Sequence, residues 1–427
     1  MAKGPAIAVG SLPGADDIHR AVLANGAVVL ARANFNSPSV VISGYLPAGG
    51  LLDPQEKLGL ADFTSSALMR GTQGRDFQEI YDTLESVGAS LGFNVGAHNV
   101  GFSGRSLVED LPVLLGMLSE TLRAPAFPAD QVEKLRALLL TRLAIRAQDT
   151  SDMASLTFDE LLYAGHPYSR SDEGWPETIA AISREDLVDF HLQHYGPRGL
   201  VLAIVGAVEP QAAAAQVERT LGDWGNPNQG AIPVLPEFEP PQKPARRHHA
   251  ITGKSQSDIV MGSCGPRRRD QEYMPASLGN SVLGQFGLMG RIGDVVREQS
   301  GLAYYAYSSL SAGIGPGAWY VSAGVNPSNV DRAVDLISQE LKRFVDDGVT
   351  SEELADSQAN FIGRLPLSLE SNAGVAGALL NVERYELGLE YYREYPGLVR
   401  AVTVEEVRNA AVKYIDPRNI VVATAGP

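Results

Sequence analysis

The chain repeats itself once, and this repeat limits the folds it can adopt more than any other feature. One match pairs SPSVVISG (37–44) with SQSDIVMG (255–262). A longer one pairs SREDLVDFHLQHYGPRGLVLAIVG (183–206) with TVEEVRNAAVKYIDPRNIVVATAG (403–426). The offset is 218 residues from 37 to 255 and 220 residues from 183 to 403, about half of the 427-residue chain. Two long copies are too few for a solenoid, so the sequence predicts two homologous domains in tandem.

The middle of the chain has the composition of a linker. Residues 225–245 hold six prolines, and proline fixes φ and has no backbone N–H to donate. Such a segment is extended rather than helical. We therefore expect an N-terminal domain over 1–224, a proline-rich linker over 225–245 and a C-terminal domain over 246–427.

Each half mixes strand patterns with long helical patterns. Strand-like runs come early, such as AVVLARA (27–33) and SVVISGYL (39–46), and an apolar run closes each half. Residues 130–145 carry apolar side chains at three- and four-residue steps, which is typical of a helix. The fold class predicted is α+β, with each domain a mainly antiparallel sheet covered by helices.

Charge and composition exclude several functions. The net charge of −15 argues against nucleic-acid binding, and we expect the basic runs at 246–249 and 267–269 to be solvated. The one cysteine, Cys264, excludes an internal disulfide framework and a thiolate zinc cluster. No apolar stretch is long enough to cross a membrane. If Met1 is the native start we expect a cytoplasmic protein, and a periplasmic one if a leader was removed.

The segment GLADFTSSALMRGT (59–72) has the pattern of a buried helix that has lost a metal site. Positions 62, 65 and 66 stand at i, i+3 and i+4 and share one face. This is the spacing of H-x-x-E-H, in which two histidines bind zinc and the glutamate activates water. The residues here are Asp62, Ser65 and Ser66. A serine hydroxyl is a poor zinc ligand and no general base, so we expect no metal in this chain.

The residues around these positions resemble the pitrilysin/insulinase family of zinc peptidases, in which this helix reads G-x-A-H-F-x-E-H-x-x-F-K-G-T. The shared residues are Gly59, Ala61, Phe63, Gly71 and Thr72. In that family the third zinc ligand is a glutamate farther along the chain. The corresponding stretch, TRLAIRAQDT at 141–150, contains no glutamate. The resemblance therefore implies that the zinc ligands and the base are all missing.

A second segment, VLGQFGLMGRIGDVVREQSGLAYYAYSSL at 282–310, resembles the same family. In active members an arginine and a tyrosine from this part of the peptidase bind the substrate carbonyl and stabilise the oxyanion. Arg297 and Tyr304 stand at that spacing, and a guanidinium and a phenol are suitable donors to such a charge. The plain alternative is a helix-end cation and a strand aromatic.

The glycines of residues 284–290 have a weaker link to function. No G-K-[ST] follows them, so a nucleotide-binding P-loop is rejected. In the processing peptidases of the family a glycine-rich loop of the zinc-less subunit contacts substrate. The resemblance thus makes Gly284, Gly287 and Gly290 candidate substrate-binding residues.

The histidines do not supply a replacement metal site. His191 and His194 stand at i, i+3 on a predicted helix, but no carboxylate pattern completes a ligand set. We expect both at the surface. His98 is expected in a strand with a structural role, and His166 is expected to pack or cap after a helix.

The resemblance implies a zinc-less, non-catalytic subunit of a heterodimeric zinc metallopeptidase, shaped as half a clamshell and inactive alone. It holds no cofactor. A homologous partner with H-x-x-E-H would bring the zinc, and the substrate would be a peptide or an unfolded protein. The alternatives are a structural or assembly subunit and a peptide-binding homodimer without a catalytic role. A hydrolase using Ser65 or Ser66 lacks a nearby histidine and a G-x-S-x-G elbow.

Overall fold

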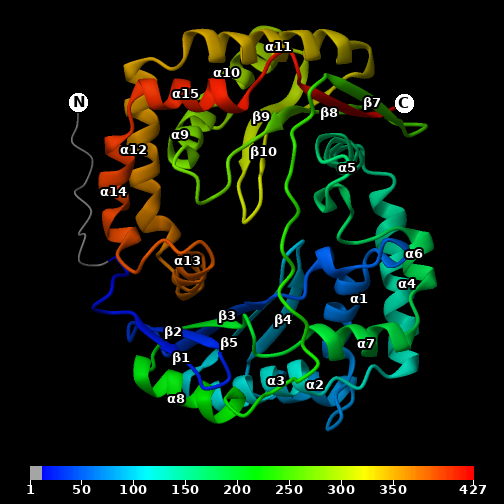
Figure 1. The fold of residues 1–427 in the computed structure, drawn as a ribbon, viewed down its shortest axis with the longest axis vertical. Helices are drawn as coiled ribbons and strands as arrows, with labels where there is room; N and C mark the ends of the chain where they lie inside the picture. The colour runs from blue at the N-terminus through cyan, green and yellow to red at the C-terminus, as the bar shows by residue number, and fades with distance from the viewer. Residues whose placement is uncertain (1–11) are drawn as a thin grey trace.

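Two mixed sheets form the framework of the molecule (Figure 1). The structure is a computed structural model and describes residues 12–427. The first sheet has the order β1-β2-β6-β3-β5-β4. Its strands are β1 (His19–Val22), β2 (Val28–Ala33), β3 (Ser39–Leu46), β4 (Ser90–Val95), β5 (Val100–Leu107) and β6 (Val201–Gly206). The β2–β6 pair is parallel, and the other neighbours are antiparallel.

The second sheet repeats this plan with the order β7-β11-β8-β10-β9. Its strands are β7 (Ala245–Ala250), β8 (Ser257–Cys264), β9 (Ala303–Ser311), β10 (Ala318–Val325) and β11 (Val421–Gly426). Only the β7–β11 pair is parallel, as only β2–β6 is in the first sheet. Without β1, the two sheets have the same order and the same strand directions. The predicted tandem repeat and the predicted α+β class are confirmed.

Helices cover the sheets of both halves. The first half contributes α1 (Leu60–Ala67), α2 (Phe77–Ser86), α3 (Leu111–Arg123), α4 (Ala129–Arg146), α5 (Thr150–Leu162), α6 (Pro176–Ala181), α7 (Arg184–His194) and α8 (Pro210–Leu221). The second half contributes α9 (Tyr273–Gly284), α10 (Gly290–Gly293), the π-helical turn η7 (Asp294–Gln299), α11 (Val330–Asp347), α12 (Ser351–Ser368), α13 (Asn372–Arg384), α14 (Tyr391–Ala401) and α15 (Val404–Tyr414). The equivalent helices α7 and α15 both begin at capping boxes, on Ser183 and Thr403. None of the helices in residues 12–427 combines the length and the apolar character needed to cross a bilayer.

The central strands β6 and β11 are buried along their whole length, because helices pack on both faces of each. On β6, Leu202 and Ile204 point to the core formed with the helices of the first half. The alternate residues Val201, Ala203 and Val205 point to a core that includes α13 of the second half. This explains why these strands are continuous apolar runs rather than alternating ones.

The two halves exchange one helix each. Helix α5 of the first half packs on β11, β8 and β7, and helix α13 of the second half packs on β6 and β3 (Figure 1). Phe158 and Leu162 of α5 join a core with Val421 and Ala423 of β11. Each sheet is therefore covered on one face by helices of its own half and on the other by a helix of the opposite half.

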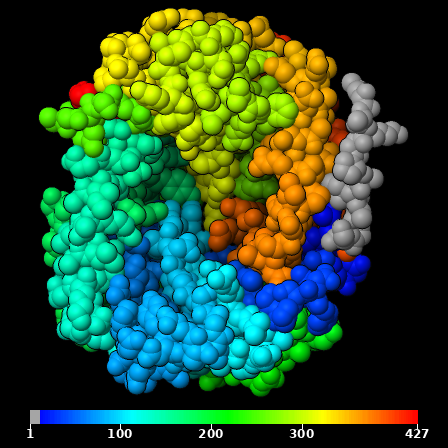
Figure 2. All heavy atoms as spheres, turned by 180° about the vertical axis from the view of Figure 1, so that it is seen from behind, coloured from blue at the N-terminus to red at the C-terminus, as the bar shows by residue number. Residues whose placement is uncertain are grey.

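A hollow remains at the centre of the molecule between the two halves (Figure 2). At one side of it the tip of the β9–β10 hairpin reaches the first half. There the Tyr168 hydroxyl accepts from the Gly315 N–H at 3.1 Å, and the Tyr163 hydroxyl donates to the Pro316 carbonyl at 3.3 Å. These contacts add to the helix exchange in holding the halves together.

The domain limits stay a proposal, because α5 packs on the sheet of the second half and α13 packs on the sheet of the first. Residues 225–244 contain no helix or strand, and β7 begins at Ala245. We therefore keep 1–224 and 246–427 as the proposed domains. The first eleven residues of the first domain, and with them most of the segment behind the leader prediction, lie outside the described residues.

The helix exchange predicts that the two halves unfold together. Replacing Phe158, which is 2% exposed, by alanine should lower the free energy of unfolding by about 3–5 kcal/mol. Urea unfolding should still show one transition when followed by both circular dichroism and tryptophan fluorescence. The control Leu367→Ala, at a side chain 69% exposed, should change stability by about 0.5 kcal/mol or less. Two separate transitions, with only one shifted by Phe158→Ala, would contradict the interlocked arrangement.

Candidate functional site

Helix α1 presents the degenerate metal positions, and its start is fixed by Asp53. The Asp53 carboxylate accepts from the Gly59 N–H at 2.7 Å and from the Ala61 N–H at 2.9 Å. Burial raises the pKa of Asp53 to about 7, although the two hydrogen bonds favour the charged carboxylate and act to lower this pKa. Gly59 has φ 90°, and a Cβ there would lie 2.6 Å from the Glu173 carbonyl oxygen, so glycine is required.

The three motif positions share one face of α1, which packs against α4, α7 and β4. Asp62 is 8% exposed and Ser65 is 2% exposed, whereas Ser66 is half-buried. The Ser65 hydroxyl is buried without a hydrogen-bond partner among residues 12–427. The α-helical geometry of α1 brings the three positions to one face, and their correspondence to metal-binding positions stays a prediction.

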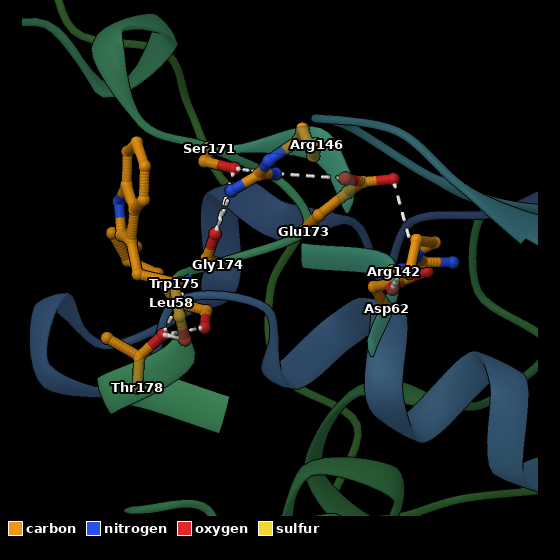
Figure 3. Close-up of polar contacts among 9 residues, drawn as sticks. All are labelled: Leu58, Asp62, Arg142, Arg146, Ser171, Glu173, Gly174, Trp175 and Thr178. Carbon is orange, nitrogen blue, oxygen red and sulfur yellow. Dashed lines mark hydrogen bonds and ion pairs between the residues drawn. The ribbon is translucent and has the colours of Figure 1, made fainter. Parts of the chain in front are cut away.

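Arg142 of α4 lies against Asp62, and Glu173 links it to Arg146 of the same helix (Figure 3). Arg142 forms an ion pair with Asp62, and its Nε lies 3.6 Å from a carboxylate oxygen of Glu173. Glu173 also pairs with Arg146 at 2.9 Å. Arg146 completes the network by donating to the Gly174 carbonyl at 2.7 Å, and its guanidinium lies over the Trp175 ring.

This charge arrangement is unsuited to a divalent cation. Burial raises the pKa of Asp62, and the positive charge of Arg142 acts in the opposite direction. A metal ion at the motif positions would meet the guanidinium of Arg142 instead of a carboxylate as its third ligand. Within residues 12–427, no cluster of three or more His, Cys, Asp or Glu side chains could hold a metal ion.

A cavity of about 550 Å³ lies beside the motif positions. Its polar lining comes from Ser65, Ser66, Arg70, Thr141 and Arg142. Its apolar lining comes from Met69, Tyr81, Leu91, Phe93, Leu135, Leu138, Leu139 and Ile145. Strand β4, which supplies Leu91 and Phe93, is one edge of the first sheet, and among residues 12–427 it pairs only with β5. A peptide backbone can add to such an edge while a side chain enters the cavity.

Arg297 and Tyr304 both lie in the second half, near the edge strand β9. Arg297 is in the turn η7, and its nearest carboxylate is that of the adjacent Glu298 at 3.7 Å. Tyr304 on β9 is 71% exposed. Among residues 12–427, no hydrogen bond or ion pair joins these two side chains to each other or to the motif positions on α1. The structure thus leaves both side chains accessible and does not assemble them with Asp62.

The three glycines of the loop differ in what they do. A Cβ on Gly284 would lie 2.2 Å from the Ser308 nitrogen, and one on Gly290 would lie 2.5 Å from the Val282 carbonyl oxygen. Both are therefore needed for close packing. Gly287 has φ 62° and open space around it, between the exposed side chains of Phe286 and Leu288. Gly284 is buried, whereas Gly287 is exposed and Gly290 lines a cavity of about 380 Å³ with Phe286 and Leu288, so a substrate could reach the last two.

Two histidine predictions were wrong. His191 is buried, and its Nε2 lies 2.9 Å from the Leu122 carbonyl oxygen, because α7 turns this side of the ring toward α3. His98 lies in the turn between β4 and β5 rather than in a strand, with Nε2 2.5 Å from the Tyr168 hydroxyl. His166 accepts from the Tyr168 N–H at 3.2 Å, which confirms its capping role.

The fold and the α1–α4 pair define the class of this protein: two tandem α+β units on the scaffold of a metallopeptidase. Residues 28–171 match the family model described as Insulinase (Peptidase family M16). Residues 181–361 match the model described as Peptidase M16 inactive domain. The chain belongs to the peptidase M16 (insulinase) family.

Relatives in this family carry contrasting names. A protein of Mycobacterium tuberculosis named an uncharacterized zinc protease is 27% identical over 374 residues, covering 86% of this chain and 84% of that protein. A Helicobacter pylori protein named a non-peptidase homolog is 23% identical over 385 residues, covering 89% and 87%. A solved structure of a peptidase M16 inactive domain from Pseudomonas fluorescens has a TM-score of 0.90 at 26% identity, covering 96% of this chain and 98% of that one. Family membership alone does not decide the activity.

Arg142 should be needed to balance the buried charge of Asp62. Arg142→Gln should lower the free energy of unfolding by about 1–3 kcal/mol at pH 8, less than for a fully buried pair because Arg142 is 43% exposed on its side chain. The loss should shrink as the pH falls toward the ordinary aspartate pKa of about 3.9, because protonated Asp62 needs no counter-charge. Urea unfolding between pH 5 and 8 measures both effects.

The matched control is Lys134→Gln on the same helix. Lys134 pairs with Asp130 at 3.0 Å, but both side chains are mostly exposed. Its loss should cost about 0.5 kcal/mol or less at every pH. Equal effects of the two substitutions would show that Arg142 has no special role.

Proposed function

We propose that this chain is the zinc-less, non-catalytic subunit of a heterodimeric zinc metallopeptidase and is inactive on its own. One observation carries the proposal. On α1 an ion pair between Asp62 and Arg142 stands where metal ligands would be, while Arg297 and Tyr304 keep accessible side chains. A chain that retains oxyanion donors without a metal site needs a second chain to complete the chemistry.

The partner in this proposal is a homologous subunit that carries H-x-x-E-H and holds the zinc. Hydrolysis of a peptide bond places negative charge on the carbonyl oxygen, and fixed donors aimed at that oxygen lower the barrier. Arg297 would supply a permanent positive charge with several N–H donors, and Tyr304 one O–H donor. The base that activates water would come from the partner.

The proposed substrate is a peptide or an unfolded segment of protein. Its backbone would form hydrogen bonds with the edge of β4. Such pairing recognises the peptide main chain and tolerates many side-chain sequences. One side chain would enter the apolar cavity of about 550 Å³ beside Ser65 and Ser66. Gly287, flanked by Phe286 and Leu288, would contact substrate from the second half.

The comparisons support this proposal without deciding it. A relative that aligns with most of this chain is named a non-peptidase homolog, as expected for a chain without zinc ligands. The apolar cavity also favours a second candidate, a peptide-binding homodimer without catalysis, because binding requires only the edge strand and the cavity. An assembly subunit would need neither the cavity nor accessible donors.

A peptidase assay separates these candidates. A quenched fluorescent peptide is incubated with this chain alone, with a homologous H-x-x-E-H subunit alone, and with both. We expect cleavage only in the mixture, and loss of cleavage on adding a chelator. A stable mixture that stays silent would favour the peptide-binding or assembly subunit. Cleavage by this chain alone would overturn the proposal.

The donor pair makes a sharper prediction for the active mixture. Arg297→Ala or Tyr304→Phe should each lower turnover about 100-fold, because each removes one donor to the oxyanion. Size-exclusion chromatography should show the complex unchanged. The control Arg332→Ala, at an exposed arginine of α11, should leave turnover within about twofold. Unchanged turnover in both donor variants would place the oxyanion donors elsewhere.

A further inference from the structure

A second cavity lies far from α1 in the sequence. Two arginines line it, and no aspartate or glutamate among residues 12–427 does. It has a volume of about 340 Å³ and lies between α9, α12, α13 and α14. Figure 1 shows α12 and α14 side by side, with α9 next to them and α13 below. We name it the tyrosine–arginine cavity after its main lining residues, Arg268, Arg364, Tyr273, Tyr391, Tyr392 and Tyr395.

Arg268 is the central residue of this cavity. The sequence prediction of a solvated run at 267–269 holds for Arg267 and Arg269 but is wrong for Arg268, which is half-buried. Its guanidinium lies 4.0 Å from the centre of the Tyr273 ring and 5.5 Å from that of Tyr391. One of its N–H groups donates to the Tyr391 hydroxyl at 2.8 Å. Aromatic stacking thus holds the guanidinium in place while most of its donors stay unused.

In the part of the chain that the structure describes, no carboxylate lies within ion-pair distance of the two arginines of the cavity. Neither Arg268 nor Arg364 forms an ion pair among residues 12–427, and no aspartate or glutamate lines the cavity in that part of the chain. This is unusual for a protein with 50 acidic and 35 basic residues. A partly buried guanidinium without an anion is costly, so an anionic ligand would be stabilised here.

The rest of the lining selects an aromatic ligand. Four tyrosines and Phe361 supply ring faces and edges, which stack on another ring. Burial raises the pKa of Tyr392 to about 12, so its hydroxyl stays protonated and can donate to an anion. The volume of about 340 Å³ is near the lower end for ligand sites, enough for one ring and a carboxylate.

A neighbouring cavity of about 450 Å³ shares Arg268, Tyr273 and Tyr391 with the tyrosine–arginine cavity. Its lining adds three carboxylates, those of Asp270, Glu386 and Glu406, and one further arginine, Arg269, which pairs with Glu386 at 2.8 Å. The carboxylates make this neighbouring cavity less favourable for an anion than the tyrosine–arginine cavity.

We propose that the tyrosine–arginine cavity binds an aromatic carboxylate, with the carboxylate against Arg268 and Arg364 and the ring among the tyrosines. Two sources share this chemistry: a free aromatic acid and the C-terminal residue of a peptide that ends in an aromatic side chain. The site lies outside the proposed split active site, and its ligand does not depend on peptidase activity.

Calorimetric titration of the full chain tests the proposal with N-acetyl-L-tyrosine and its uncharged analogue N-acetyl-L-tyrosinamide. We expect the acid to bind at least about tenfold more tightly than the amide, since a tenfold change corresponds to about 1.4 kcal/mol, the scale of one charged contact. Arg364→Gln should weaken binding of the acid by at least about tenfold. Because Arg364 is exposed, this variant should fold normally. The matched control Arg400→Gln removes the same charge from the exposed surface of α14 and should leave binding unchanged.

A second arm separates the two sources of ligand. It uses a tetrapeptide ending in tyrosine, once as the free acid and once as the C-terminal amide. Binding of the peptide acid as well as the small acid assigns the cavity to chain ends. Binding of the small acid alone assigns it to free aromatic acids. Equal binding of acid and amide, no binding of either acid, or binding unaffected by Arg364→Gln would each overturn the proposal.

Discussion

The exchange of helices between the two halves is the interaction on which the rest of the structure depends. Each central strand, β6 and β11, is apolar on both faces, and the helices of its own half cover only one of them. Helix α5 covers β11, and α13 covers β6. Because α5 follows α4 after three residues, the docking of α5 also fixes the end of α4, from which Arg142 and Arg146 project. The geometry of the degenerate site in one half is thus set by packing against the other.

The same constraint explains why an arginine of α4 lies against Asp62. Helices α1 and α4 must still pack together, and a bare Asp62 between them would be a buried, unbalanced charge. The network of Arg142, Glu173 and Arg146 supplies the balancing charge and ties the α4 helix to the loop before α6. The Ser65 hydroxyl is buried without a hydrogen-bond partner among residues 12–427, which destabilises the fold less than an unbalanced charge would. Asp62 thus serves to join helices α1 and α4 through its ion pair with Arg142.

Much of this architecture could be predicted from the sequence, since it follows from local sequence patterns. The repeat at an offset near 220 residues predicted two equivalent sheets, and the i, i+3, i+4 spacing predicted the shared face of Asp62, Ser65 and Ser66. The helix exchange could not be predicted, because an apolar stripe shows that a helix is buried but not which sheet covers it. The pairing of Arg142 with Asp62 joins residues 80 positions apart. One indirect sign of this pairing is present in the sequence. The stretch 141–150 lacks a glutamate and instead has two arginines, Arg142 and Arg146, one helical turn apart.

The surface of the second half gives a physical reason to expect a covering partner. The exposed side chains of Phe286 and Leu288 lie on the loop that follows α9, and Gly284, the last residue of α9, packs so closely on Ser308 of β9 that a Cβ there would lie 2.2 Å from the Ser308 nitrogen. Tyr304 is on the same strand, and β9 is an edge with one unpaired side. Exposed edges and clustered apolar side chains promote unwanted association unless something covers them. In a single chain these features are a liability; in the proposed heterodimer an interface at this edge would cover them and would bring Arg297 and Tyr304 to a carbonyl held by the other subunit.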